Sequence, residues 1–132
     1  MKIDICFITS TPHLESHAAL SNRHMALAHL VLQDEEYARF YKDTNKFVIM
    51  DNSAFEFEQE GRGVPQEEVY KAAKLIDADE VAAIDILFNG ADTVDSVKDF
   101  LRFMKRKDEI YFDTTNFMAI PQAVSYTHLT LP

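Results

Sequence analysis

The sequence predicts an α/β fold in which parallel strands alternate with helices, and two patterns lead to this prediction. Short apolar runs occupy residues 46–50 (KFVIM), 80–87 (EVAAIDIL) and 116–120 (NFMAI). Such runs are typical of strands buried on both faces of a parallel sheet. Between them, apolar residues recur at the spacing of amphipathic helices. Strand and helix patterns that alternate in this way favour a parallel sheet with helical crossovers.

The first part of the chain is predicted to contain one strand and two helices. Residues 2–9 (KIDICFIT) form an apolar run that indicates a buried strand. Apolar residues at helical spacing predict a first helix over 22–32 and a second over 35–42.

The later helices have clearer signals. After an acidic loop, Pro65 stands at a first helical position, and the stripe that follows consists of Val69, Ala72, Ala73 and Ile76. Another helix is expected to begin at Asp92 and to end in a basic run, 105–107, that suits the helix dipole. The predicted order has four strands. Four strand–helix units are half of an eight-stranded barrel of about 250 residues, so the chain is either a small open α/β domain or the N-terminal half of something larger.

Composition narrows the class of protein. The chain has 132 residues, with 13 Lys and Arg against 22 Asp and Glu, which argues against a surface that coats nucleic acid. Its single cysteine, Cys6, excludes an internal disulfide and a cysteine zinc cluster within the chain. No apolar run reaches the roughly 18 residues of a membrane helix, and the N-terminus lacks a secretory signal pattern, so we expect a cytoplasmic protein without a membrane partner.

The last nine residues, 124–132 (VSYTHLTLP), differ from the pattern before them. They carry no charge and resemble the translation of a sequencing adapter at the end of a metagenomic reading frame. We therefore expect residues 1–123 to form a partial domain and 124–132 to be a non-native tail; the alternative is a short threonine-rich strand.

Two carboxylates stand at the ends of predicted strands. Asp51 follows the strand 46–50, and Asp85 lies near the end of 80–87. Ligand sites of parallel α/β folds lie at the carboxyl ends of their strands, so both acids would face one mouth. There they could bind the N–H donors of a purine edge or transfer protons. The alternative is that both acids cap helices or turns.

Other residues near these strand ends are candidates on weaker grounds. Phe55 and Phe57 could stack on a flat heterocycle, although a phenylalanine in such a position is more often a core residue. Gln122 could donate to a carbonyl and accept from an amine. The histidines lack a recognised metal-ligand spacing, so no metal site is expected; those considered are His13, His17, His24 and His29.

Four ordered blocks together carry a family resemblance. Residues 47–56 (FVIMDNSAFE), 78–85 (ADEVAAID), 91–93 (ADT) and 117–122 (FMAIPQ) resemble blocks of the tRNA-guanine transglycosylase superfamily. The first block is most similar to the phage and bacterial relatives with I-L-D-N-[GS]-A-F-E, some of which place 7-deazaguanines in DNA. The resemblance covers residues 1–123.

The resemblance implies the N-terminal half of a TIM (β/α)8 barrel and a base-exchange reaction. In that family an aspartate nucleophile displaces guanine from tRNA or DNA, and a 7-deazaguanine such as queuine, preQ1 or preQ0 then displaces the enzyme. Asp51 would be the catalytic residue that assists proton transfer. The implied substrate-binding residues are Asn52, Phe55, Asp85 and Gln122, where Phe55 stacks on the base and Asp85 binds its edge.

Several features depart from the family pattern. Asn52-Ser53-Ala54 replaces Ser-Gly-Gly of the tRNA enzymes, and Glu56 replaces their glutamine, which favours the phage-type branch. The family nucleophile and zinc site belong to the C-terminal half, so no cofactor is expected here and the chain alone should be inactive. The resemblance further implies a bacterial or phage-infected cell and a possible homodimer. The alternatives are a small non-catalytic α/β binding module and a barrel enzyme of another family.

Overall fold

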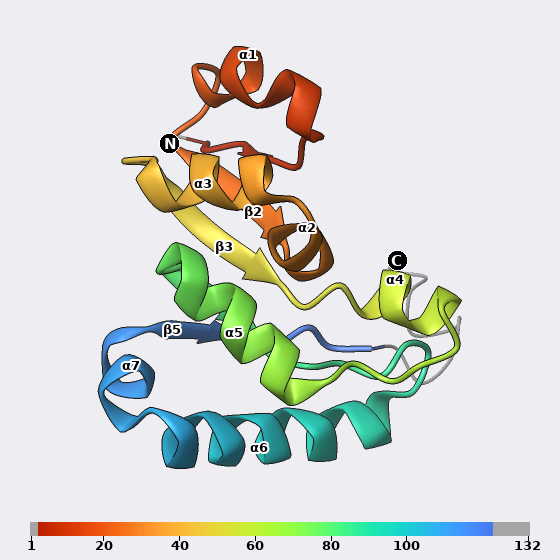
Figure 1. The fold of residues 1–132 in the computed structure, drawn as a ribbon. Coiled ribbons are helices and arrows are strands. Elements are labelled where there is room, and N and C mark those ends of the chain that lie inside the picture. Colours follow the sequence, from red (N-terminus) through yellow and green to blue (C-terminus); the bar gives the residue numbers. More distant parts are fainter. Residues whose placement is uncertain (1–2, 123–132) are drawn as a thin grey trace.

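A computed structural model of the chain describes residues 3–122, and its strands form one parallel five-stranded sheet (Figure 1). The strands are β1 (Cys6–Phe7), β2 (Arg23–Leu27), β3 (Phe47–Asp51), β4 (Glu80–Ala82) and β5 (Asn116–Met118). They lie side by side in chain order, and each neighbouring pair is parallel. The predicted α/β class, with parallel strands that alternate with helices, is therefore confirmed.

Helices connect every pair of neighbouring strands. They are η1 (Thr11–His13), α1 (Leu14–Ala18), α2 (Ala28–Gln33), α3 (Glu35–Asp43), α4 (Ala54–Gln59), α5 (Gln66–Ile76), α6 (Gly90–Lys107) and α7 (Glu109–Thr114). In Figure 1, α3 and α5 lie in front of the strands. The apolar stripe predicted for 69–76 is buried in α5, as the i, i+3, i+4, i+7 spacing requires.

The core lies between the helices and one face of the sheet. Alternate strand residues such as Ala26, Val48, Met50 and Val81 are buried in it together with residues of α2, α3, α5 and α6. On β2 the residues between them point to the other face, and Arg23, Met25 and Leu27 remain partly exposed there. The sheet is therefore more deeply covered on one side of β2 than on the other.

The predicted helix over 22–32 is wrong in its first half. Residues 23–27 form β2, which pairs with β3 from Arg23↔Phe47 to Leu27↔Asp51, and only Ala28–Gln33 is helical. A short apolar segment can fit both periods, and here pairing with β3 decided in favour of the strand. The sheet consequently has five strands where the sequence predicted four.

Several predicted boundaries also change. The strand expected at 80–87 ends at Ala82, and the strand expected at 2–9 covers only Cys6–Phe7. The acidic loop after β3 contains α4, and α7 was not predicted. The helix expected from Asp92 begins at Gly90, because the Asn89 side chain accepts a hydrogen bond from the Asp92 backbone N–H at 3.0 Å and caps its first turn.

Two further expectations from the sequence concern a membrane helix and the C-terminal tail. No helix within residues 3–122 is long and apolar enough to cross a membrane. The expected tail, 124–132, lies outside the described residues.

Candidate functional site

The structure brings the sequence-predicted site residues together at the carboxyl edge of the sheet. Asp51 ends β3, Asp85 follows β4, and Gln122 follows β5. Phe55 lies in the first turn of α4, directly after β3. Because the strands are parallel, their carboxyl ends meet at one edge, and a cavity of about 280 Å³ lies there.

The cavity draws a residue from the carboxyl end of each strand. Ile8 follows β1, Leu27 ends β2, Asp51 ends β3, Asp85 follows β4 and Ile120 follows β5, and all five line the cavity. Its lining is thus partly apolar, while three carboxylates, Asp51, Glu56 and Asp85, supply acceptors. Within the part of the chain that the structure describes, no lysine or arginine lines it.

Asp85 is the centre of the hydrogen-bond network at this edge. Its side chain is buried, with the residue 4% exposed. Its Oδ1 accepts from Asn52 Nδ2 at 2.9 Å, and its Oδ2 accepts from Gln122 Nε2 at 2.6 Å. The carboxylate therefore ties the end of β3 to the segment after β5.

Asn52 is bonded to protein at every polar group of its side chain. Its amide Nδ2 donates to Ala83 O at 2.8 Å as well as to Asp85, and its Oδ1 accepts from the Ala54 backbone N–H at 2.9 Å. The residue is 1% exposed. This geometry leaves Asn52 no free N–H for a ligand and makes it a residue that positions Asp85 and the turn into α4.

Asp51 has a different environment from Asp85. It is partly exposed, and its Oδ2 accepts from the Ser53 backbone N–H at 2.9 Å. Burial raises the pKa of the Asp51 carboxyl, and the negative charges of Glu56 and Asp85 raise it further. A carboxyl that holds its proton more readily than usual, and that faces a cavity, suits proton transfer to or from a base.

Ser53 holds the turn between β3 and α4 in an unusual conformation. Its φ of 55° lies in the left-handed region, and its side chain is fully buried. Its Oγ accepts from the His29 backbone N–H at 3.2 Å and lies 2.9 Å from His29 Nδ1. These contacts fix the turn against the start of α2, and strain of this kind is often found beside functional sites.

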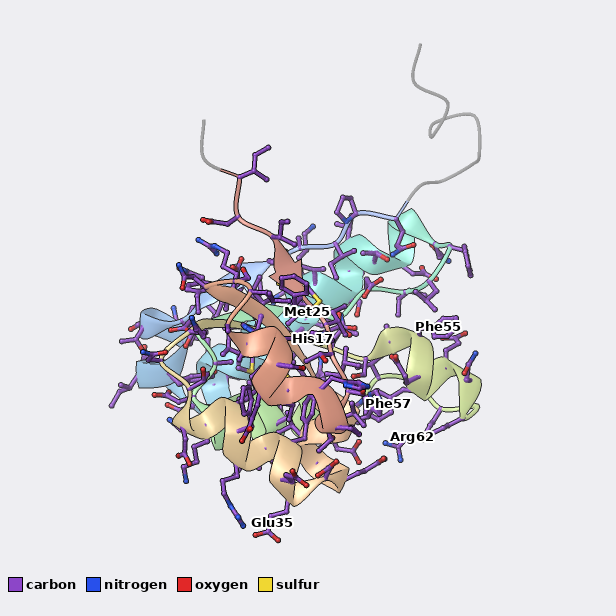
Figure 2. All side chains as sticks on the ribbon, turned by 90° about the horizontal axis from the view of Figure 1, so that it is seen from above. His17, Met25, Glu35, Phe55, Phe57 and Arg62 are labelled. Carbon is purple, nitrogen blue, oxygen red and sulfur yellow. The ribbon has the colours of Figure 1, made fainter. Side chains whose placement is uncertain are left out.

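The two phenylalanines of α4 have opposite roles. Phe57 is 2% exposed, and the Arg62 guanidinium lies over its ring at 4.8 Å. Phe55 is 59% exposed and lines the cavity. Figure 2 shows the two side chains on opposite sides of α4. Phe57 is therefore a core residue, whereas the Phe55 ring can meet a ligand.

Part of this site is not predicted from the sequence. The sequence predicts Leu27 inside a helix and Ile8 and Ile120 only as strand residues. It predicts no contact between His29 and Ser53. The sequence signal for such residues is their position at the end of an apolar run. Leu27 cannot be found in this way, because the segment 22–32 is predicted as a helix and not as a strand.

No metal centre emerges from the described residues. Residues 3–122 contain no cluster of three or more His, Cys, Asp or Glu side chains that could hold a metal ion. His24 is buried between the sheet and α3, with its ring 6.0 Å from that of Tyr41. The rings of His13, in η1, and His17, in α1, lie 5.7 Å apart and are tilted by 39° to each other.

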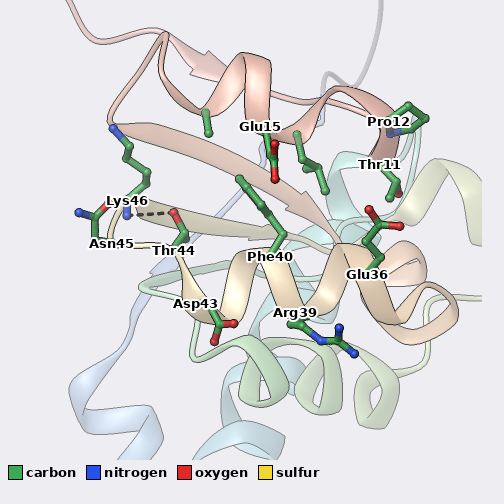
Figure 3. Close-up of a pocket in the computed structure, with 12 residues that line it drawn as sticks. Thr11, Pro12, Glu15, Glu36, Arg39, Phe40, Asp43, Thr44, Asn45 and Lys46 are labelled. Carbon is green, nitrogen blue, oxygen red and sulfur yellow. Dashed lines mark hydrogen bonds between the residues drawn. The ribbon is translucent and has the colours of Figure 1, made fainter.

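A larger cavity, of about 840 Å³, lies elsewhere, between η1 and α1 on one side and α3 on the other (Figure 3). Its charged groups have mixed signs and include Glu15, Glu36, Arg39 and Lys46. Arg39 is already paired with Glu35 at 2.7 Å, and Lys46 Nζ donates to Asn22 Oδ1 at 3.2 Å. The larger cavity is therefore notable only for its volume. The smaller cavity is the one lined by the carboxylates and the aromatic ring at the strand ends.

Comparison of the chain with protein-family models, curated proteins and solved structures finds no match. Any functional assignment therefore rests on the geometry at the carboxyl edge of the sheet and on the motif resemblance.

Proposed function

We propose that the chain is the N-terminal half of a TIM (β/α)8 barrel of the tRNA-guanine transglycosylase superfamily, and that its carboxyl-edge cavity binds a 7-deazaguanine. The observation that carries the proposal is that Asp51, Asp85 and an exposed Phe55 ring line one cavity, while Gln122 is bonded to Asp85 beside it. These residues come from three strand ends that are far apart in the sequence.

The chemistry of the cavity suits a guanine-like base. Such a base is flat and presents adjacent N–H donors along one edge, which a carboxylate such as Asp85 accepts in charge-assisted hydrogen bonds. Gln122 donates one amide N–H to Asp85 and accepts from the Phe88 N–H, which leaves its second amide N–H to donate to a ring carbonyl. The exposed Phe55 ring offers a stacking surface, and Asp51 supplies a proton acceptor or donor.

The sheet topology supports the barrel part of the proposal. The strand order follows the chain order without reversal, whereas doubly wound sheets bind ligands where their order reverses. Sequential parallel strands with helical crossovers are the arrangement that closes into a barrel. Each open edge, β1 and β5, would then pair with strands of the other half.

In this proposal, the nucleophile and the zinc site are not supplied by this chain. The nucleophile and the zinc site of the family belong to the C-terminal half, and the full-length parent would act on tRNA or DNA in the cytoplasm of a bacterium or a phage-infected cell. Both candidate substrates, tRNA and DNA, share one requirement: the target nucleotide must be unstacked from its strand to enter the cavity.

Calorimetric titration of the purified chain with the free base preQ0 tests the proposal. We expect the parent to bind and Asp85→Asn to bind about tenfold more weakly, because the base loses a charge-assisted bond. Asp95→Asn, an exposed acid on α6, is the matched control and should bind like the parent. A parent chain that does not bind preQ0, preQ1 or guanine would contradict the assignment.

A further inference from the structure

Phe88, in the turn between β4 and α6, is the feature that the proposed function leaves unexplained. Its side chain is 86% exposed, the highest value among the large apolar residues that the structure describes. Its φ of 61° lies in the left-handed region, which disfavours any residue with a Cβ and a bulky ring more than most. A large apolar ring is thus presented to solvent on a strained backbone.

The turn that carries Phe88 is held in place from both sides. Thr93 Oγ1 accepts from the Ile86 N–H at 2.9 Å and donates to Ile86 O at 3.0 Å, and Thr93 itself is buried. The Asn89 N–H donates to Ile86 O at 3.1 Å, and the Asn89 side chain caps α6. These contacts fix residues 86–89, so the exposure of Phe88 is a property of an ordered turn.

The same turn is joined to the candidate site. The Phe88 N–H donates to Gln122 Oε1 at 3.2 Å, and Gln122 Nε2 donates to Asp85. Leu87 lines the cavity, whereas Phe88 is outside the lining. Phe88 therefore directly follows a residue that lines the cavity, and its backbone is bonded to the side chain that contacts Asp85.

We infer that Phe88 is a stacking platform for the nucleobase adjacent to the one held in the cavity, on a single-stranded nucleic acid. The inference rests on the proposed function and adds to it the recognition of a flanking base. An unstacked strand exposes the faces of its neighbouring bases, and an aromatic ring can stack on any of them. Because no described lysine or arginine lines the cavity, this contact would depend little on salt.

The test compares two probes on the same variants. The first probe is the free base preQ0, and the second is a single-stranded pentanucleotide with a central guanine, flanked by thymines in its DNA form and by uracils in its RNA form. We expect Phe88→Ala to weaken pentanucleotide binding about 5- to 150-fold and to leave preQ0 binding unchanged. Phe88→Tyr, which keeps a ring, should bind both probes like the parent. Ile110→Ala removes another exposed apolar side chain, on α7 before β5, and should change neither.

A double-mutant cycle locates the contact. A pentanucleotide with an abasic site beside the guanine should bind the parent as weakly as the intact strand binds Phe88→Ala, and the two losses should not add. Full additivity at every abasic position, or an equal loss of preQ0 affinity in Phe88→Ala, would overturn the inference while leaving the base site intact. A parent that binds the pentanucleotide through Phe88 but binds no free base would instead refute the proposed function.

Discussion

Asp85→Ala should destabilise the fold as well as the site, and the structure allows the size of the effect to be worked out. The substitution removes the acceptor of two hydrogen bonds, from Asn52 Nδ2 at 2.9 Å and from Gln122 Nε2 at 2.6 Å. Hydrogen bonds to charged groups contribute about 1.5–3 kcal/mol each. From the sequence alone we expect a strand-end acid facing a cavity to have little packing to lose, whereas the structure gives Asp85 a buried position and these two bonds.

The sum of these two contributions is an upper bound for three reasons. Asn52 keeps its bond to Ala83 O, and the Gln122 side chain is only partly buried, so its freed amide can reach water. Removal of a buried carboxylate also relieves its desolvation. We therefore expect the free energy of unfolding to fall by about 2–4 kcal/mol, a large share of the roughly 5–15 kcal/mol typical of a domain.

Urea denaturation followed by far-ultraviolet circular dichroism measures this loss. Asp85→Asn should fall between parent and Asp85→Ala, because its amide oxygen still accepts one bond while its NH₂ faces a donor. Asp95→Ala on the exposed side of α6 serves as the control and should remain within about 0.5 kcal/mol of the parent. An Asp85→Ala chain as stable as this control would show that the network of Asn52, Asp85 and Gln122 does not hold the carboxyl edge together.

Three further predictions follow from other parts of the molecule. Because the pKa of Asp51 is raised in the folded chain, stability is lost as pH rises from the usual carboxyl range through that raised pKa. Asp51→Asn should therefore unfold at a higher urea concentration than the parent at pH 7, and the difference should shrink towards zero below about pH 4. A difference that does not change with pH would contradict this. His24 is buried with both ring nitrogens unbonded among the described residues, so His24→Leu should raise the unfolding free energy by about 1–2 kcal/mol in the same assay, and a loss would refute the reasoning. The partly exposed sheet face around Met25 should make the chain self-associate, so light scattering after size-exclusion chromatography should detect species above the monomer, and a monodisperse monomer would oppose the half-barrel proposal.

Sequence patterns predicted the parts of the fold that carry a strong local signal. The stripe of α5 fits the helical period, and the run of β3 is short and β-branched at its centre, so both elements are where the pattern indicated. The segment 22–32 fitted the helical period, yet its first half pairs with β3, a contact that no local pattern contains. Long-range pairing, not propensity, therefore decided the identity of β2.

The candidate site could be predicted in position but not in detail. The positions of Asp51 and Asp85 after apolar runs sufficed to place both acids at one edge, since parallel strands share their carboxyl ends. The hydrogen bonds of Asn52 and the left-handed conformation of Phe88 depend on the positions of backbone groups in the neighbouring segments. Neither a residue type nor a spacing encodes that information.

Because the cavity is lined by residues from all five strand ends, binding of a ligand there should depend on whether the edges of the sheet are locally folded. The edge strands are short, two residues in β1 and three in β5, and such strands fray at a lower free energy than a core does. Fraying of either one would remove a wall, Ile8 or Ile120, while the helical core stays folded. A bound ligand must then slow amide hydrogen exchange at both edges by the factor 1 + [L]/Kd, so exchange at β1 and β5 would report occupancy of a cavity that neither strand forms alone.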